Sequence, residues 1–408
     1  MTERDFAIDV VRTLQQAGFQ ALWAGGCVRD ELLGLLPHDY DVATDAHPEQ
    51  VMKLFRRSIA IGAAFGVIEV IGPRGPHRQH LTVEVATFRS DGVYTDGRRP
   101  DSVTFSSPQE DARRRDFTIN GMFFDPIARQ LHDYVGGRDD LDAKVLRAIG
   151  DPAARFSEDK LRVLRAVRIA ARFELAVDAA TRAAARRIAP QIPVVSAERI
   201  AEELRRLLAH PNRTRGAELL RDLGLLPPLF PELTGEADRL ERVLSRLGPE
   251  ASFELAFAAM LISLSKRQAE CIADRLKLAT AEKVRIAWLV EQHRTLEDAP
   301  SMRLSRLKPI LIHPGIGELI ALHRAESLAS GRGTEPVEFC ERMLRETPME
   351  ELNPPPLVTG EDLIALGLQP GPEFKRLLDA VRESQLEGQV RSKADGLELI
   401  GELKGFAQ

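Results

Sequence analysis

Two aspartates spaced two positions apart are the clearest chemical feature of this sequence. Asp39 and Asp41 lie in the stretch HDYDVATD, where polar and apolar residues alternate as in a β-strand. Alternate side chains of a strand project from the same face, so both carboxylates are expected on one face, about 6–7 Å apart along it. Two carboxylates in this arrangement suit Mg²⁺ and phosphoryl chemistry.

A pair of glycines precedes the aspartates. Gly25 and Gly26 follow the apolar residues 21–24, and apolar residues then recur at helical spacing over residues 28–36. A helix that begins at two glycines presents its first backbone N–H groups without a side chain in the way, and its dipole favours negative charge. The stretch therefore predicts a strand, a phosphate-binding turn, a short helix and a second strand that carries the carboxylates.

The composition sets the class of protein. The chain has 408 residues, of which 44% are hydrophobic and 29% charged, so two or more domains with ordinary cores are expected. Three widely spaced cysteines without metal-type spacing, and no charged-then-apolar leader, indicate a cytoplasmic protein. No apolar run is long enough for a membrane span, so no membrane association is expected. The formal net charge is −5, but residues 151–220 alone sum to about +5.

Periodicity divides the chain into two kinds of structure. Residues 67–71 and 81–88 are strand-like, with glycines and prolines between them, whereas the helical period prevails from about residue 158 to the end. The fold class is therefore predicted as α+β, with an N-terminal head of mixed β-sheet and helices followed by all-α segments. The predicted domains are the head (1–150), a helical neck (151–220), a helical body (221–300) and a helical tail (301–408).

Further charged residues of the head have two interpretations each. Glu84 lies among β-branched neighbours in TVEVATFR, and is either a third metal ligand or base, or a solvated strand residue. Arg113, Arg114 and Arg115 stand directly before Asp116. Adjacent arginines more often form a solvated patch, but a position between strands of a phosphate-handling head favours the binding of a triphosphate.

A basic stripe is predicted on the first long helix. Ser157 is expected to cap this helix, with Glu158 and Asp159 in the first turn. One arc of roughly 120° then carries four arginines, namely Arg162, Arg165, Arg168 and Arg172. Taken alone, this pattern favours a solvated face on which Glu158 pairs with Arg162 at i, i+4.

The motifs together resemble one family, the class II tRNA nucleotidyltransferases, which comprise the bacterial CCA-adding enzymes and their poly(A) polymerase relatives. The resemblance rests on motifs that occur in the family order, namely GGCVRDELLG with DYD, EVATFR, RRDFTINGMFFDP, EDKLRVLRAVR and SAERI. The segments VTGEDLIALGLQPGPEF and QLEG are also similar to the C-terminal helical region of the family. A lone DxD or glycine pair is weak evidence, whereas five ordered motifs are specific.

The resemblance implies that residues 1–150 are a nucleotidyltransferase catalytic head, that the neck (151–220) recognises the nucleotide base and that the tail (301–408) binds tRNA. It also implies roles for the head residues. Asp39 and Asp41 would hold Mg²⁺ ions, and Glu84 matches the third carboxylate of the catalytic set. The incoming triphosphate would be bound by the glycine turn and two arginines, namely Gly25, Gly26, Arg29 and Arg115.

The resemblance also changes the interpretation of the neck helix. Asp159 and Arg162 would recognise the base of CTP or ATP without a nucleic-acid template, and Arg165 and Arg168 would line the nucleotide pocket. The other substrate would be tRNA, bound along its acceptor stem and T-arm, by a monomer or homodimer.

Several functions share these motifs. Addition of C, C and A to tRNA from CTP and ATP is the leading hypothesis, and an A-adding enzyme that completes tRNA ending in CC is the closest alternative. A loop around Arg98 matches the flexible loop that CC-adding enzymes tend to lack. A poly(A) polymerase is disfavoured because residues 62–65, GAAF, lack the paired basic motif that follows the glycine in such enzymes. A catalytically silent RNA-binding protein is disfavoured because both aspartates and the glycine pair are intact.

Overall fold

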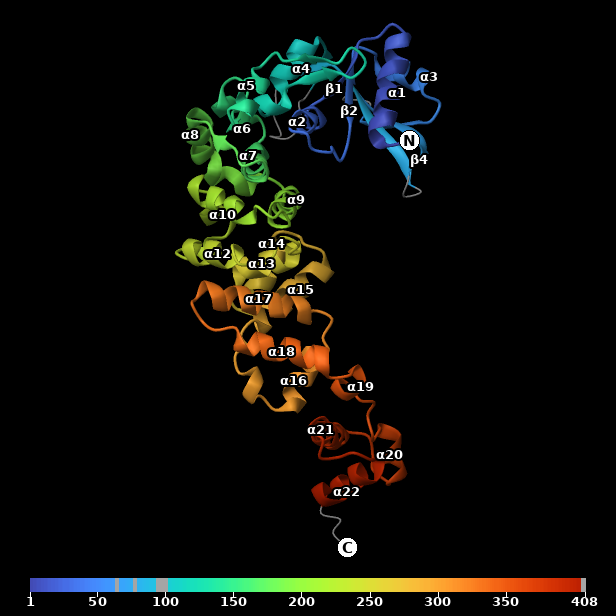
Figure 1. The fold of residues 1–408 in the computed structure, drawn as a ribbon, viewed down its shortest axis with the longest axis vertical. Coiled ribbons are helices and arrows are strands. Elements are labelled where there is room, and N and C mark those ends of the chain that lie inside the picture. The colour runs from blue at the N-terminus through green and yellow to red at the C-terminus, as the bar shows by residue number, and fades with distance from the viewer. Residues whose placement is uncertain (63–65, 76–78, 93–101, 405–408) are drawn as a thin grey trace. The chain divides into compact units, whose positions relative to one another are not determined.

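The computed structural model describes residues 1–408 except 63–65, 76–78, 93–101 and 405–408 (Figure 1). The expectations for Arg98 and for the GAAF segment after its glycine therefore lie outside the described residues. The chain divides into two compact units, residues 1–207 with 215–234, and residues 208–214 with 235–408. The first unit contains a mixed sheet followed by helices, and the elements of the second unit are helices. The predicted α+β class is confirmed, and the four-domain division stays a prediction.

The head is built on a seven-stranded sheet with the strand order β3-β4-β5-β2-β1-β8-β9. The pair of β2 and β5 is parallel, and the other pairs are antiparallel. The strands predicted at residues 67–71 and 81–88 are confirmed as β4 and β5. The strand bounds are Ala21–Ala24 (β1), Asp41–Thr44 (β2), Ser58–Gly62 (β3), Val67–Arg74 (β4), His80–Thr87 (β5), Phe123–Asp125 (β8) and Gln130–His132 (β9).

The two faces of this sheet differ in what covers them. Helices α1 (Glu3–Gln16) and α3 (Pro48–Leu54) pack against one face, where the ring of Phe6 approaches Gly72 so closely that a Cβ there would lie 2.7 Å from it. On the opposite face, α4 (Pro108–Arg114) contributes Ala112 to a buried cluster. The other buried members of that cluster are Leu22, Ala24, Ala43, Phe88 and Phe123. The polar side chains of β5, by contrast, remain exposed at alternate positions.

The turn after β1 forms as predicted. Helix α2 (Gly26–Leu32) begins directly after Gly25, whose φ of +74° lies in the left-handed region that glycine adopts without strain. Strand β2 begins only at Asp41, so Asp39 lies in the segment leading into the strand rather than within it. The alternation of the aspartates therefore starts before the hydrogen-bonded ladder does.

The expected start of the neck helix at Ser157 is wrong. Ser157 lies inside helix α6 (Pro152–Glu158), which ends at Asp159, where the backbone is extended. A second helix, α7 (Leu161–Arg172), follows. The true start signal is Asp151, whose carboxylate accepts hydrogen bonds from the amides of the first turn, followed by Pro152 at the first helical position. Because Asp159 bends the chain, its carboxylate accepts the Leu161 N–H instead of lying in a first turn.

The remaining elements complete both units. A hairpin of β6 (Arg89–Asp91) and β7 (Val103–Phe105) lies next to α4, and β10 (Val145–Leu146) pairs in parallel with β11 (Ala176–Val177). The first unit also contains η2 (Thr118–Asn120), α5 (Gly137–Asp142), α8 (Ala179–Ile188), η3 (Ala189–Val194), α9 (Ala197–Leu208), α10 (Arg213–Asp222), α11 (Leu226–Leu229) and η4 (Pro231–Leu233). Within the described residues, every helix is too short or too polar to cross a lipid bilayer.

The second unit is a succession of helices. Their bounds are Ala237–Leu244 (α12), Phe253–Leu261 (α13), Lys266–Arg275 (α14), Thr280–Gln292 (α15), Ala299–Ser301 (η5), Leu304–Leu311 (α16), Ile316–Ala329 (α17), Glu335–Glu346 (α18), Met349–Leu352 (α19), Gly360–Ala365 (α20), Pro372–Leu386 (α21) and Lys393–Lys404 (α22). The last helices form a core of their own, with Leu363, Leu377 and Val381 among its buried residues.

Gly137 provides a test of the packing that holds η2 in place. A Cβ at this position would overlap the carbonyl oxygen of Thr118 and lie 2.8 Å from the Cγ of Met122. We expect Gly137→Ala to lower the free energy of unfolding by about 1–3 kcal/mol, as overpacked positions do. The measurement is urea unfolding followed by the fluorescence of Trp23, which is fully buried in β1.

The matched control is Gly317→Ala in α17, where a Cβ would meet nothing within 4 Å. Alanine has the higher helix propensity, so this variant should be as stable as the wild type or more stable. An unchanged midpoint for Gly137→Ala would contradict the packing role of this glycine.

Candidate active site

Carboxylates from neighbouring strands line up on the exposed face of the sheet. Asp41 of β2 stands opposite Glu84 of β5, and Glu84 stands opposite Glu69 of β4. Neighbouring strands are about 4.8 Å apart, so these side chains form a row. Asp39, in the segment before β2, lies close enough for its negative charge to raise the pKa of both Asp41 and Glu84.

The crowding of these acids changes their protonation. The protein packed around the Asp41 carboxylate raises its pKa although the residue remains accessible to solvent; Arg115 opposes this shift, and the like charge of Asp39 adds to it. The pKa of Glu84 is raised by the same loss of solvation, and then by Asp41, Glu69 and Asp39. A cation bound among these oxygens would relieve the repulsion.

The donor set fits a divalent metal ion, which nucleotidyltransferases in general use. All the available ligands are carboxylate oxygens, the type that Mg²⁺ prefers. Within the described residues, no three His, Cys, Asp or Glu side chains already stand together as a metal cluster.

The glycine turn lies at the same end of the sheet. The register of β1 and β2 pairs Trp23 with Val42, so the turn at Gly25 and Gly26 comes next to the segment that leads into Asp41. A Cβ at Gly25 would lie 2.8 Å from Nη1 of Arg115, so this glycine permits both the left-handed backbone and the close approach of the guanidinium.

Arg115 is held in a fixed position beside the turn. Arg115 is the C-cap residue that follows α4. Its Nη2 and Nε donate to Oδ2 of Asp111 at 3.0 and 3.2 Å. Its guanidinium also lies over the ring of Phe123, 5.0 Å from the ring centroid. A fixed guanidinium next to the first turn of a helix and near carboxylates is an arrangement that suits a metal-associated triphosphate.

Arg29 is engaged inside the protein. It is 7% exposed, and it donates to Oδ1 of Asp30 from Nε and Nη2 at 2.8 and 2.6 Å, and to Oδ1 of Asn120 from Nη1 at 2.6 Å. Its guanidinium lies 4.2 Å from the centroid of the Phe173 ring. These contacts give Arg29 a structural function, and its contact with a triphosphate stays a prediction.

A buried network continues from Asn120 into the neck. Nδ2 of Asn120 donates to Oδ1 of Asp116 at 3.1 Å, and Nε of Arg165, on α7, donates to Oδ2 of Asp116 at 2.8 Å. Burial by itself would raise the pKa of Asp116, but Arg165, Asn120 and the charge of Arg162 outweigh it and lower the pKa to about 2. The ionised carboxylate therefore links η2 of the head to α7.

The two residues predicted to recognise the base lie on either side of the break between α6 and α7. Asp159 and Arg162 are each 9% exposed. The Asp159 carboxylate accepts hydrogen bonds from Nη2 and Nη1 of Arg199, on α9, at 2.7 and 3.2 Å. Nη1 of Arg162 donates to Oε2 of Glu158 at 2.6 Å, which confirms the predicted i, i+4 pair. Their role in base recognition stays a prediction.

The basic stripe of α7 is not simply a solvated face. Beyond the Arg162 pair, each of the other three arginines pairs with an acid from a different element, as Arg165 does with Asp116 (2.7 Å), Arg168 with Glu203 of α9 (2.6 Å) and Arg172 with Asp30 of α2 (3.7 Å). The stripe therefore fastens the neck to neighbouring elements, and a place for Arg165 and Arg168 in the nucleotide pocket stays a prediction.

Some residues that hold this site in place have roles that the motifs do not indicate. Asn120 lies within RRDFTINGMFFDP and Arg199 within SAERI, but their contacts with Asp116 and Asp159 do not follow from the motifs. An asparagine inside an otherwise apolar run was a signal, because buried amides need partners. Glu203 and Arg155 gave no comparable signal, since charged residues at helical spacing are common on solvated faces.

Comparison with protein families defines the class. Residues 21–147 match the model of the poly A polymerase head domain, and residues 174–236 match that of the probable RNA and SrmB-binding site of polymerase A. The chain is thus similar to the poly A polymerases in its head domain and in the segment that follows it.

Individual relatives narrow the class. The CCA-adding enzyme of Streptococcus gordonii is 37% identical over 289 residues, 70% of each chain, and that of Streptococcus sanguinis is 31% identical over 390 residues, 94% of this chain and 93% of the relative. The crystal structure of the Bacillus stearothermophilus CCA-adding enzyme in complex with CTP matches with a TM-score of 0.80 at 27% identity, over 100% of this chain and 99% of that chain. The chain belongs to the family of CCA-adding enzymes, as its motifs predict.

Asp116 allows a test by pH. Because its pKa in the folded protein is lowered to about 2, it contributes stability above its unfolded pKa of roughly 4, and this contribution is lost as the pH falls through that window. We expect Asp116→Asn to cost about 2 kcal/mol at pH 6, and the difference from the wild type to shrink between pH 4 and pH 2. Urea unfolding at a series of pH values measures this difference.

The matched control is Asp139→Asn, at an exposed position in α5. Its unfolding free energy should follow that of the wild type at every pH. A difference between wild type and Asp116→Asn that stays constant from pH 6 to pH 2 would contradict the ionised state of the buried carboxylate.

Proposed function

We propose that this protein adds C, C and A in succession to the 3′ end of tRNA, using CTP and ATP and no nucleic-acid template. One observation carries the proposal: in a member of the CCA-adding family, Asp41 lies at the same end of the sheet as Gly25 and the guanidinium of Arg115 that approaches it. A metal-binding carboxylate face beside a triphosphate-binding turn is what nucleotidyl transfer requires.

The head residues carry the transfer step in this proposal. Asp39 and Asp41 would hold Mg²⁺, with Glu84 as the third carboxylate. The pKa values of Asp41 and Glu84 are raised first by loss of solvation and then by neighbouring like charges, which a metal would neutralise. Bound there, Mg²⁺ would lower the pKa of the 3′ hydroxyl of the tRNA and stabilise the leaving pyrophosphate. The amides of the glycine turn and Arg115 orient the triphosphate so that the hydroxyl attacks the α-phosphorus in line.

Asp159 and Arg162 select the base. A carboxylate accepts a hydrogen bond from the exocyclic amine of cytosine or adenine, and an arginine donates to the adjacent ring acceptor. Uracil and guanine carry a carbonyl oxygen in place of that amine, so a buried acceptor would face another acceptor. The Asp159 carboxylate accepts three hydrogen bonds, from Arg199 and from the Leu161 N–H, and a carboxylate accepts about four, so it can accept one more from a base.

The helical segments bind the tRNA. A stacked duplex offers little sequence to read, so recognition of the acceptor stem and T-arm depends on shape and phosphate contacts. The match of residues 174–236 to an RNA-binding region supports this assignment.

One experiment separates the candidate activities. The purified protein is incubated with tRNA lacking CCA, or lacking only the final A, with CTP and ATP supplied singly and together, and products are resolved to single nucleotides on a gel. We expect two additions with CTP alone and three with both nucleotides. Extension only of tRNA ending in CC would identify an A-adding enzyme, and a long tail from ATP a poly(A) polymerase.

The aspartates of the head allow a direct test of the transfer step. Replacing Asp39 or Asp41 with Ala should lower the rate of both C and A addition by about a thousandfold, because the metal loses its ligands. Binding of tRNA, measured on filters, should stay close to that of the wild type. Asp139→Ala, at an exposed position of the same unit, is the control and should be fully active; retained incorporation in both aspartate variants would refute the metal assignment.

The neck residues allow a test of base selection. Asp159→Ala or Arg162→Ala should lower the preference for CTP and ATP over UTP and GTP by about 10- to 100-fold, measured as ratios of kcat/KM. Arg187→Ala, at an exposed position on α8, is the matched control and should keep the wild-type ratio. An unchanged ratio in both neck variants would remove the base-reading role.

A further inference from the structure

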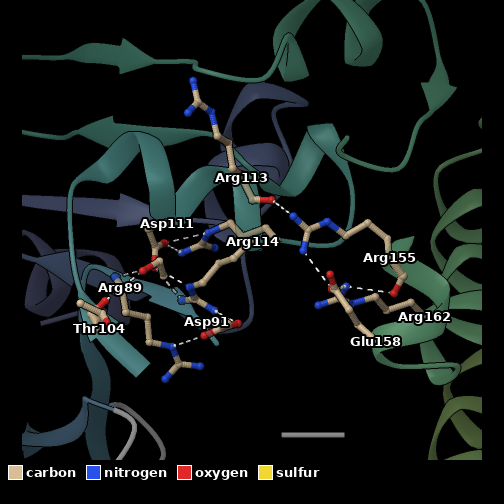
Figure 2. Close-up of polar contacts among 11 residues, drawn as sticks. Arg89, Asp91, Thr104, Asp111, Arg113, Arg114, Arg155, Glu158 and Arg162 are labelled. Carbon is tan, nitrogen blue, oxygen red and sulfur yellow. Dashed lines mark hydrogen bonds and ion pairs between the residues drawn. The ribbon is translucent and has the colours of Figure 1, made fainter. Parts of the chain in front are cut away.

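Arg155 of α6 lies at a junction between the head and the neck that the proposed chemistry does not use. Figure 2 shows its side chain between the backbone at Arg113 and the carboxylate of Glu158. Nη1 donates to Oε2 of Glu158 at 2.9 Å, Nε donates to the carbonyl oxygen of Ile149 at 3.2 Å, and Nη2 donates to the carbonyl oxygen of Arg113. One guanidinium thus contacts three separate segments of the chain.

The same residue holds Arg162 by two routes. The Oε2 atom of Glu158 that accepts from Arg155 also accepts from Nη1 of Arg162, at 2.6 Å. That Nη1 also donates to the backbone carbonyl oxygen of Arg155, at 3.1 Å (Figure 2). The shared carboxylate accepts from both guanidinium groups, and Arg162 is only 9% exposed, so the position of the Arg162 side chain depends on Arg155 and Glu158.

Arg155 also contacts the segment that carries Arg115, the residue proposed to bind the triphosphate. The carbonyl oxygen that accepts from Arg155 belongs to Arg113, in the last turn of α4, and Arg115 is the C-cap residue of that helix. Beside this junction, the side chain of Arg114 pairs with Asp111 and Asp91, which ties the last turn of α4 to β6 (Figure 2). Arg155 therefore connects the segment that contains Arg115 to Arg162, which is proposed to donate a hydrogen bond to the base.

We propose that Arg155 is a positioning residue that fixes Arg162 relative to Arg115, and that it thereby sets the selectivity for CTP and ATP. This inference rests on the proposed function. A nucleotide has its base and its triphosphate at opposite ends, so selection by base requires that the groups binding the two ends keep a fixed spacing. A planar guanidinium with donors in a rigid fork suits this task, because it engages acceptors in several directions at once.

The test compares nucleotide selectivity in Arg155→Ala, Arg155→Lys, Arg162→Ala and the double variant Arg155→Ala/Arg162→Ala. We expect Arg155→Ala to lower the ratio of kcat/KM for CTP and ATP over UTP and GTP by about tenfold. Arg155→Lys should lose most of that ratio as well, because the three acceptors are engaged by three different guanidinium nitrogens and a single ammonium nitrogen cannot reach all of them. The matched control is Arg138→Ala, which removes an arginine from an i, i+4 ion pair on another short helix of the same unit.

The double variant distinguishes positioning from an independent effect. If Arg155 acts through Arg162, the double variant should have the same ratio as Arg162→Ala alone. A ratio lowered by the product of the two single effects would overturn the inference. Wild-type selectivity in both Arg155→Ala and Arg155→Lys would overturn it as well.

Two further readouts separate the alternative outcomes. Urea unfolding shows whether a variant is folded, and if Arg155→Ala is not, the comparison is made with Arg155→Lys and its double variant under the same criteria. If the wild type adds no CCA to tRNA, the proposed function itself fails. If the wild type is active and Arg162→Ala relaxes selectivity while the Arg155 variants do not, only the inference about Arg155 fails.

Discussion

The arrangement of the first unit depends on one buried carboxylate. Asp116 accepts hydrogen bonds from Asn120 and Arg165, and through Asn120 it is connected to Arg29 on the helix that follows the glycine turn. An ion buried without partners would cost several kcal/mol, so the network is stable only when all its members are present. The phosphate-binding turn and the neck helix are thereby held by the same set of charges.

The site combines two opposite electrostatic conditions. On the open face of the sheet, loss of solvation and like charges raise the pKa values of Asp41 and Glu84, and the charge of Arg115 only opposes the shift at Asp41. Later in the chain, Asp111 and Asp116 are paired with arginines, and their pKa values are lowered. The first condition favours a metal ion supplied from solution, and the second fixes the scaffold that surrounds it.

The sequence predicted the elements that have strong local signals. The glycine turn, strands β4 and β5 and the Glu158–Arg162 pair follow from spacing and residue type. The predicted cap at Ser157 is wrong because Asp151, followed by Pro152, already satisfies the first amides of α6. The contacts of Arg155 and Arg199 join residues up to 42 positions apart, and helical periodicity contains no information about such partners. Only the tertiary structure identifies them.

The pairing of the α7 arginines alters what the basic segment contributes to RNA affinity. Residues 151–220 carry about five excess positive charges, a sum that already includes the acidic partners of Arg162 and Arg168. Two more arginines of the stripe, Arg165 and Arg172, pair with acids from outside the segment. An arginine that is paired with an acid neutralises less phosphate charge, so it releases fewer of the counterions condensed on the RNA. The salt dependence of RNA binding should therefore be weaker than the charge of the segment implies, and it should arise from cations outside this stripe.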